Sequence, residues 1–316
     1  MRLSLKLQNS PQGRLIKMND FDKILGGYVE EINKAADYYV SSAAFKGRES
    51  AGLDAMLDAM AYSLSNGGKR IRPVLTLEFC RVCGGDYKAA IPFALGVEMI
   101  HTYSLIHDDL PCMDNDDMRR GKPSSHKVYG EANALLAGDG LLTLAFETVL
   151  SADISADKKA LAALELAKAA GVSGMIGGQV MDLANEGRSV TLEEIKATDR
   201  LKTGEMIRVA AVMGCIAAGA GSEMIAAAEK YCENIGLAFQ IVDDILDVTS
   251  DDATLGKPVG SDSENEKSTY VSHLGIEKSK AYARELTAQA KAALDIFGGE
   301  GEFLSELADR LSERKK

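Results

Sequence analysis

Apolar residues recur every three or four positions along most of the chain, which is the spacing of amphipathic helices. The first clear stripe contains Phe21, Ile24, Leu25, Val29, Ile32 and Ala36. Similar patterns predict helices over about 51–64, 71–83, 88–110, 131–151, 157–182, 191–219, 222–248, 268–295 and 302–313. Alternating apolar and polar patterns long enough for strands are missing. The sequence therefore predicts an all-α protein of about ten helices.

The main turn signals fall between these helical segments. Asn66-Gly67-Gly68 and Gly121-Lys122-Pro123 are such signals, and Pro111 directly follows an apolar helix that it should end. The chain shows neither a repeat nor a long linker, so we expect one domain over residues 18–316. Residues 1–17 are basic, contain no acid and lack the apolar core of a secretory signal. We expect this extension to lie outside the fold.

Composition and charge exclude several classes of partner. The chain has 316 residues, of which 36 are Lys or Arg and 47 are Asp or Glu, and its net charge of −11 has the wrong sign for a nucleic-acid-binding protein. Five cysteines is an odd number, which argues for a reducing cytoplasm rather than a secreted disulfide framework. The longest uncharged run, Val209 to Ser222, is shorter than the roughly 20 residues that span a bilayer. We expect a cytoplasmic protein with no nucleic-acid partner and no membrane span.

Two clusters of aspartates stand in apolar surroundings. Five carboxylates lie between Asp108 and Asp117, at the end of an apolar helix, and Asp243, Asp244 and Asp247 interrupt a second apolar segment. Either cluster alone fits a solvated helix end or an incidental calcium site. Two such clusters favour Mg²⁺, which takes oxygen ligands and completes its shell with water and phosphate. Bound metal stabilises a departing diphosphate, so the clusters indicate ionisation of a diphosphate ester.

Six short motifs follow one another along the chain. They are Gly67-Gly68-Lys69-Arg70-Ile71-Arg72-Pro73, Asp108-Asp109-Leu110-Pro111-Cys112-Met113-Asp114 with Arg119-Arg120-Gly121, His126-Lys127-Val128-Tyr129-Gly130-Glu131, Gly177-Gly178-Gln179, Lys202-Thr203-Gly204, and Phe239-Gln240 before the second aspartate cluster. In content and order they resemble the trans-type isoprenyl diphosphate synthases. The resemblance implies a homodimer whose subunit is a barrel of antiparallel helices around a central cavity. It also implies a prenyltransferase that joins isopentenyl diphosphate head to tail to an allylic diphosphate.

The same resemblance assigns roles to individual residues. The expected metal ligands, around a cluster of about two or three Mg²⁺ ions, are Asp108, Asp109 and Asp114 on one side and Asp243, Asp244 and Asp247 on the other. The expected ligands of isopentenyl diphosphate are Lys69, Arg72, His101 and Arg120. The expected ligands of the allylic diphosphate, dimethylallyl or geranyl, are Arg119, Lys202, Lys257 and Lys267. The residues expected to act in catalysis are Asp108, Asp114, Lys202, Thr203, Gln240 and Asp243.

His101 and the basic residues 314–316 each have a simpler interpretation. His101 fits a hydrogen-bonded core histidine as well as a substrate ligand. Arg314-Lys315-Lys316 resembles a basic tail that helps close the site, but a solvent-exposed chain end has the same composition.

Product length is expected to depend on bulk below the first aspartates. Tyr103 lies five residues before Asp108, roughly 7.5 Å along a helix, and Ser104 lies one turn below Asp108. A large ring at position 103, with the inserted Pro111-Cys112, resembles bacterial members of the family that form farnesyl diphosphate. We therefore expect a C15 product. The alternatives are a geranylgeranyl-forming synthase, a terpene cyclase and a non-catalytic partner subunit.

Overall fold

The computed structural model describes residues 11–41, 45, 51–249 and 268–314, with side chains described from Asp20 onward. The helices are α1 (Pro11–Tyr39), α2 (Ala51–Ser65), α3 (Ile71–Val82), α4 (Ile91–Asp108), α5 (Ser125–Tyr129), α6 (Glu131–Leu150), α7 (Ala156–Ala170), α8 (Met175–Asn185), α9 (Leu192–Asp199), α10 (Glu205–Ala218), α11 (Ser222–Thr249), α14 (Tyr270–Leu274), α15 (Ile276–Ala293) and α16 (Glu302–Ser312). A π-helical segment, η2 (Arg200–Gly204), joins α9 to α10, and a 3₁₀ segment, η3 (Asp295–Gly301), precedes α16.

The predicted all-α fold is confirmed. Within the described residues, strands are limited to β1 (Met118–Arg119) and β2 (Lys122–Pro123), which pair antiparallel. Pro111 follows α4 closely, as the sequence predicts, because proline cannot donate the backbone hydrogen bond that a continuing helix needs.

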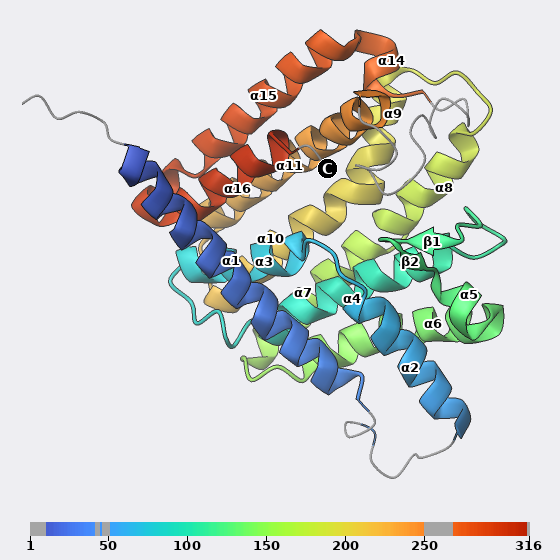
Figure 1. Cartoon of the computed structure of the whole chain (residues 1–316). Coiled ribbons are helices and arrows are strands. Elements are labelled where there is room, and N and C mark those ends of the chain that lie inside the picture. Colours follow the sequence, from blue (N-terminus) through green and yellow to red (C-terminus); the bar gives the residue numbers. More distant parts are fainter. Residues whose placement is uncertain (1–10, 42–44, 46–50, 250–267, 315–316) are drawn as a thin grey trace, which may run out of the picture.

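Helices α3, α4 and α10 form the centre of the bundle. Nearly every residue of α10 from Met206 to Ile216 is buried, as expected of a helix that is apolar all round. Helix α4 packs against α6, α10 packs against α3, and α11 packs against α15. Figure 1 shows α8, α9 and α14 on the same side of the bundle as the β1–β2 hairpin. The candidate site lies on this side.

Three predicted helices are interrupted in the structure. The segment 157–182 divides into α7 and α8, because the backbone leaves helical geometry at Gly171 and Gly174. The segment 191–219 passes through the π-helical turn η2, and the segment 268–295 divides at Gly275, whose φ is 78°. In each case apolar residues continue across the interruption, so spacing alone did not reveal it.

The first helix begins earlier than predicted. Helix α1 starts at Pro11, so helical backbone extends into the segment that we expected to lie outside the fold. The residues of α1 that reach the core include Phe21, Ile32 and Ala36, which belong to the predicted stripe. The boundary between extension and domain stays a prediction.

Length and composition alone would allow two stretches to cross a membrane. These are Glu131–Leu150 and Ala156–Asn185, of whose most apolar windows 44% and 33%, respectively, are buried inside the protein. The second stretch contains the break between α7 and α8. Core helices of globular proteins pass the same test, so the expected absence of a membrane span stays a prediction.

Candidate active site

The first aspartate motif begins at the end of α4. Asp108 is the last residue of the helix, and the following loop folds back so that the Asp114 N–H donates to the Asp108 carbonyl at 2.8 Å. Asp109 is only 2% exposed and accepts hydrogen bonds from Arg119, at 2.9 Å from Nε and also from Nη2. Arg119 also contacts Asp116, at 3.1 Å. The hairpin that carries Arg119 therefore supplies a cation to the motif.

Burial, and then the crowding of carboxylates, makes the ionised form of this motif unfavourable. Burial raises the pKa of Asp108 to about 6; Asp114 and Asp109 add to the rise, whereas Lys202 and Arg119 oppose it. Burial also raises the pKa of Asp109, although Arg119 lowers it. An added cation would hold these carboxylates in their ionised form. Their oxygen donors fit Mg²⁺, which prefers carboxylates and phosphates.

A second cluster in the site is positively charged and contains Arg72, His101 and Arg120. Arg120 Nη2 lies 3.4 Å from His101 Nε2, and Arg120 Nη1 donates to the Gly67 carbonyl at 3.0 Å. Burial first, and then the charges of Arg72 and Arg120, lower the pKa of His101 well below its usual value. Burial and the nearby Arg120 also lower the pKa of Arg72 to about 10. Such a cluster of donors fits an anion with several charges.

The glycine-rich turn before α3 makes room for this cluster. A Cβ atom at Gly68 would lie 2.6 Å from Arg120 Nη1, and the φ of Gly68 is +102°. Arg70, next in the chain, is buried and donates to Glu98 at 2.7 Å and to the Leu64 carbonyl at 2.6 Å. Arg70 therefore fixes the turn, while Lys69 beside it is exposed.

The π-helical segment η2 connects the two aspartate motifs. Lys202 Nζ donates to Asp182 of α8 at 2.7 Å. Burial disfavours the charge on Lys202, yet Asp182, Asp108 and Asp114 together raise its pKa. Helix α8 can approach η2 this closely only because residue 178 is glycine, since a Cβ atom at Gly178 would overlap the Lys202 backbone nitrogen. Thr203, the next residue of η2, is half-buried.

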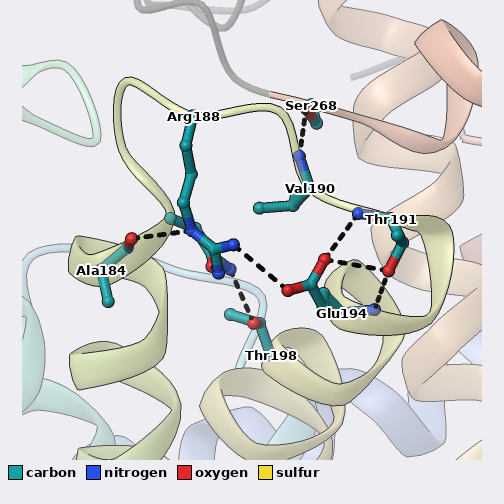
Figure 2. A network of polar contacts seen from close by, with 8 residues as sticks. Ala184, Arg188, Val190, Thr191, Glu194, Thr198 and Ser268 are labelled. Carbon is teal, nitrogen blue, oxygen red and sulfur yellow. Dashed lines mark hydrogen bonds and ion pairs between the residues drawn. The ribbon is translucent and has the colours of Figure 1, made fainter.

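A polar network joins the end of α8 to α9 (Figure 2). Arg188 donates to the Ala184 carbonyl at 3.0 Å and to Glu194 at 3.2 Å. Glu194 and Thr191 form a capping box that starts α9. The Val190 N–H donates to Ser268 Oγ at 3.5 Å, so the segment before α14 joins the same network.

The second aspartate motif lies near the end of α11. Asp243 pairs with Arg314 at 2.6 Å, Asp244 accepts from the Tyr270 N–H at 2.7 Å, and Asp247 is 2% exposed. Asp199 of α9 interacts with the side chains of Gln240 and Tyr270, which lower its pKa, but burial dominates and raises it to about 6. Asp199 thus links the second motif to η2.

Tyr103 lies below the first motif, as predicted. Its ring is 5% exposed and its hydroxyl makes no hydrogen bond. Burial and the charge of Asp108 raise the pKa of Tyr103 to about 12. Ser104 is half-buried and donates to the His101 carbonyl at 2.9 Å.

The structure groups most of the predicted residues but also adds others. Asp108, Asp114 and Lys202 lie within electrostatic reach of one another, as do Arg72, His101 and Arg120. The residues that sequence reasoning missed are Asp182, Asp199 and Tyr270. An acid inside an apolar helix was the available signal for Asp182. Lys257 and Lys267 lie outside the described residues.

No metal centre is formed by protein side chains alone in the described part of the chain, since no three His, Cys, Asp or Glu side chains there are arranged to hold an ion. Arg119 pairs with Asp109, Arg314 pairs with Asp243, and Lys202, which pairs with Asp182, adds a nearby positive charge to Asp108. Mg²⁺ commonly keeps several waters and binds through one or two carboxylates together with phosphates, so the donor set still fits this metal.

Comparisons with known proteins match the chain to one enzyme family. A family model described as polyprenyl synthetase matches residues 54–295. The farnesyl diphosphate synthase of Bacillus subtilis is 46% identical over 267 residues, which are 83% of this chain and 89% of that protein. The geranylgeranyl diphosphate synthase of Cyanophora paradoxa is 44% identical over 81% of this chain and 87% of its own. The crystal structure of an FPP/GFPP synthase from Zymomonas mobilis matches with a TM-score of 0.81 and 34% identity, covering 92% of this chain and 97% of that one.

These matches extend over most of the chain and nearly the full length of each relative. Members of the matched family are generally Mg²⁺-dependent and act on isoprenyl diphosphates, as the donor set and the cation cluster suggest. The chain belongs to the polyprenyl synthetase family and is a prenyltransferase.

Proposed function

We propose that this prenyltransferase is a farnesyl diphosphate synthase. It would condense isopentenyl diphosphate with dimethylallyl diphosphate and then with geranyl diphosphate, giving (2E,6E)-farnesyl diphosphate. The observation that carries the proposal is that the site contains two sets of cations: Arg72, His101 and Arg120 lie together, and Lys202 lies within electrostatic reach of Asp108 and Asp114. Two separate anion sites suit a reaction that joins two diphosphates.

Each anion site has residues suited to its substrate. Arg72 and Arg120 offer planar guanidinium groups to isopentenyl diphosphate, and the neutral imidazole of His101 adds a donor without further repulsion. Lys69 is adjacent in sequence and completes this set. Arg119 and Lys202 serve the allylic diphosphate, together with Lys257 and Lys267 from outside the described residues.

The reacting carbons would lie beside η2 and α11. The oxygen atoms of Thr203 and Gln240 would stabilise positive charge on the allylic carbons, and Asp199 would hold the Gln240 amide in place. Mg²⁺ bound by the aspartates of both motifs, Asp108, Asp109, Asp114, Asp243, Asp244 and Asp247, would neutralise the charge that develops on the leaving diphosphate. The proton lost from the condensation product would pass to that diphosphate.

Tyr103 favours a C15 product. Its buried ring lies about one and a half helical turns below Asp108, where a growing chain would meet it. Relatives named as farnesyl and as geranylgeranyl synthases match at similar identity, 46% and 44%. Geranylgeranyl diphosphate synthase is therefore the second candidate.

The test is incubation of the purified protein with Mg²⁺, isopentenyl diphosphate and dimethylallyl diphosphate, followed by chromatography of the dephosphorylated alcohols. We expect a C15 alcohol that is lost on chelation of the metal. The variant Tyr103→Ala should give mainly C20 or longer products. Tyr38→Ala, which changes a 64%-exposed tyrosine on α1, is the matched control and should still give C15.

Other outcomes separate the alternatives. Mainly C20 alcohol from the unaltered protein would make it a geranylgeranyl synthase, and a cyclic hydrocarbon would make it a terpene cyclase. If the protein condensed isopentenyl diphosphate with none of the allylic diphosphates, the result would favour a non-catalytic partner subunit.

We also propose that the enzyme is a cytoplasmic homodimer. The leucines exposed on α6 are Leu135, Leu136 and Leu150, and those on the neighbouring α7 are Leu161 and Leu164. A second copy packed on these helices would bury this apolar surface. Cys80, Cys83, Cys112, Cys215 and Cys232 are all free thiols, which suits a reducing compartment.

A further inference from the structure

Arg314, which follows α16, is held against the second aspartate motif. Its Nη2 atom lies 2.6 Å from Asp243 Oδ1 and donates to the Phe239 carbonyl at 2.9 Å. Its guanidinium carbon lies 3.7 Å from the centre of the Phe239 ring. These three contacts fix one side chain to two residues one turn apart on α11.

Burial distinguishes this ion pair from an ordinary surface pair. The Arg314 side chain is 9% exposed, whereas that of Asp243 is 47% exposed. An exposed arginine would lose most of its attraction to solvent screening, but the Phe239 ring covers this guanidinium and adds a cation–π contact. Arg314 is therefore a fixed cation rather than a mobile chain end.

The position of Arg314 conflicts with metal binding at Asp243. A Mg²⁺ ion coordinated by a carboxylate oxygen lies about 2.0–2.1 Å from it. Arg314 Nη2 approaches the Oδ1 atom of the same carboxylate to 2.6 Å. Two positive groups that share one carboxylate repel each other, so the docked arginine and a metal ion disfavour each other.

We propose that Arg314 is a tethered cation that occupies Asp243 until a metal ion displaces it. The inference rests on the proposed role of Asp243 as a metal ligand. The arginine neutralises the carboxylate in the free enzyme and lowers its affinity for metal. Because such coupling is reciprocal, metal binding must weaken the docking of Arg314 by the same factor.

The test measures binding of Mn²⁺, as a probe for Mg²⁺, to the full-length protein without substrates, by electron paramagnetic resonance. Arg314→Gln should bind Mn²⁺ about fivefold more tightly than the unaltered protein. The matched control is Arg310→Gln, since Arg310 also stacks on a phenylalanine, 4.1 Å from the Phe21 ring, but pairs with Asp22 and Glu306. This control should leave Mn²⁺ affinity unchanged.

A second measurement follows Arg314 without replacing it. Hydrogen exchange in the peptide that contains α16 and Arg314 should become faster when Mn²⁺ is added, and not in an Asp243→Asn background. Unchanged or weaker Mn²⁺ binding by Arg314→Gln, or exchange that is unaffected by Mn²⁺, would overturn the proposal. If Asp243→Asn itself leaves Mn²⁺ affinity intact, the metal role of Asp243 fails first, and the two failures are thereby distinguished.

Discussion

The histidine of the cation cluster is expected to stay neutral at a pH where an ordinary histidine is half charged. Burial and the neighbouring Arg72 and Arg120 lower the pKa of His101, because protonation would add a further buried positive charge. Binding of inorganic diphosphate places negative charge beside the ring and should raise the pKa again.

NMR of histidine-labelled protein checks this prediction. Of the four histidines, the signal of His101 is assigned by its loss in His101→Gln, and the exposed His273 serves as internal reference. The prediction is wrong if His101 titrates near pH 6.5 in the free protein, or if diphosphate leaves its titration unchanged.

Sequence was informative for residues that belong to a pattern. Asp108 and Asp243 stand in clusters of acids, and Arg72 and Arg120 stand in glycine-flanked motifs, so their grouping could be predicted. Asp182 is a single acid whose meaning depends on Lys202, twenty residues away. The resemblance allowed a basic tail near the site, but the pairing of Arg314 with Asp243 was not predictable, because only the fold brings Arg314 to α11.

At the level of elements, the contact of α8 with η2 should tolerate no side chain at Gly178. A methyl group there would overlap the Lys202 backbone, so α8 must shift and the Lys202 to Asp182 contact with it. For Gly178→Ala we expect a loss of about 1–3 kcal/mol in the free energy of unfolding and a lower turnover.

Urea denaturation and initial rates test this expectation. Gly27→Ala is the control, because its added Cβ would meet nothing within 4 Å on the exposed face of α1. This control should be neutral or more stable by up to about 1 kcal/mol. Equal stability of Gly178→Ala and the unaltered protein would show that α8 can move without penalty.

The sequence predicted which segments are helical but not where those helices are interrupted. Helical periodicity and Pro111 gave the main helices because burial of an apolar stripe decides them. The α7–α8 break and the π-helical turn depend on contacts between helices, such as the approach of Gly178 to η2. Such contacts leave no periodic trace in one sequence.

For the whole molecule, the exposed leucines of α6 predict a homodimer. Leu135 and Leu136 are 45% and 52% exposed, and burying them against a second copy is favourable. Light scattering should give twice the chain mass of 33.7 kDa for the unaltered protein and the single mass for Leu135→Glu/Leu136→Glu. Ile24→Glu, at a 42%-exposed position on α1, should remain a dimer. A monomeric unaltered protein would refute the assignment.

The π-helical turn at Arg200–Gly204 limits how the chain can evolve. A π turn holds an extra residue relative to an α-helix, and each helical residue rotates the next side chain by about 100°. Deleting one residue here would restore regular α-helical hydrogen bonding. It would also rotate Lys202 about the helix axis with respect to Asp199, so that Lys202 would no longer point at Asp182. The segment therefore represents a trade-off between stability and activity, in which a less regular backbone lets Asp199 of α9 and Lys202 of η2 face different partners, Gln240 and Asp182.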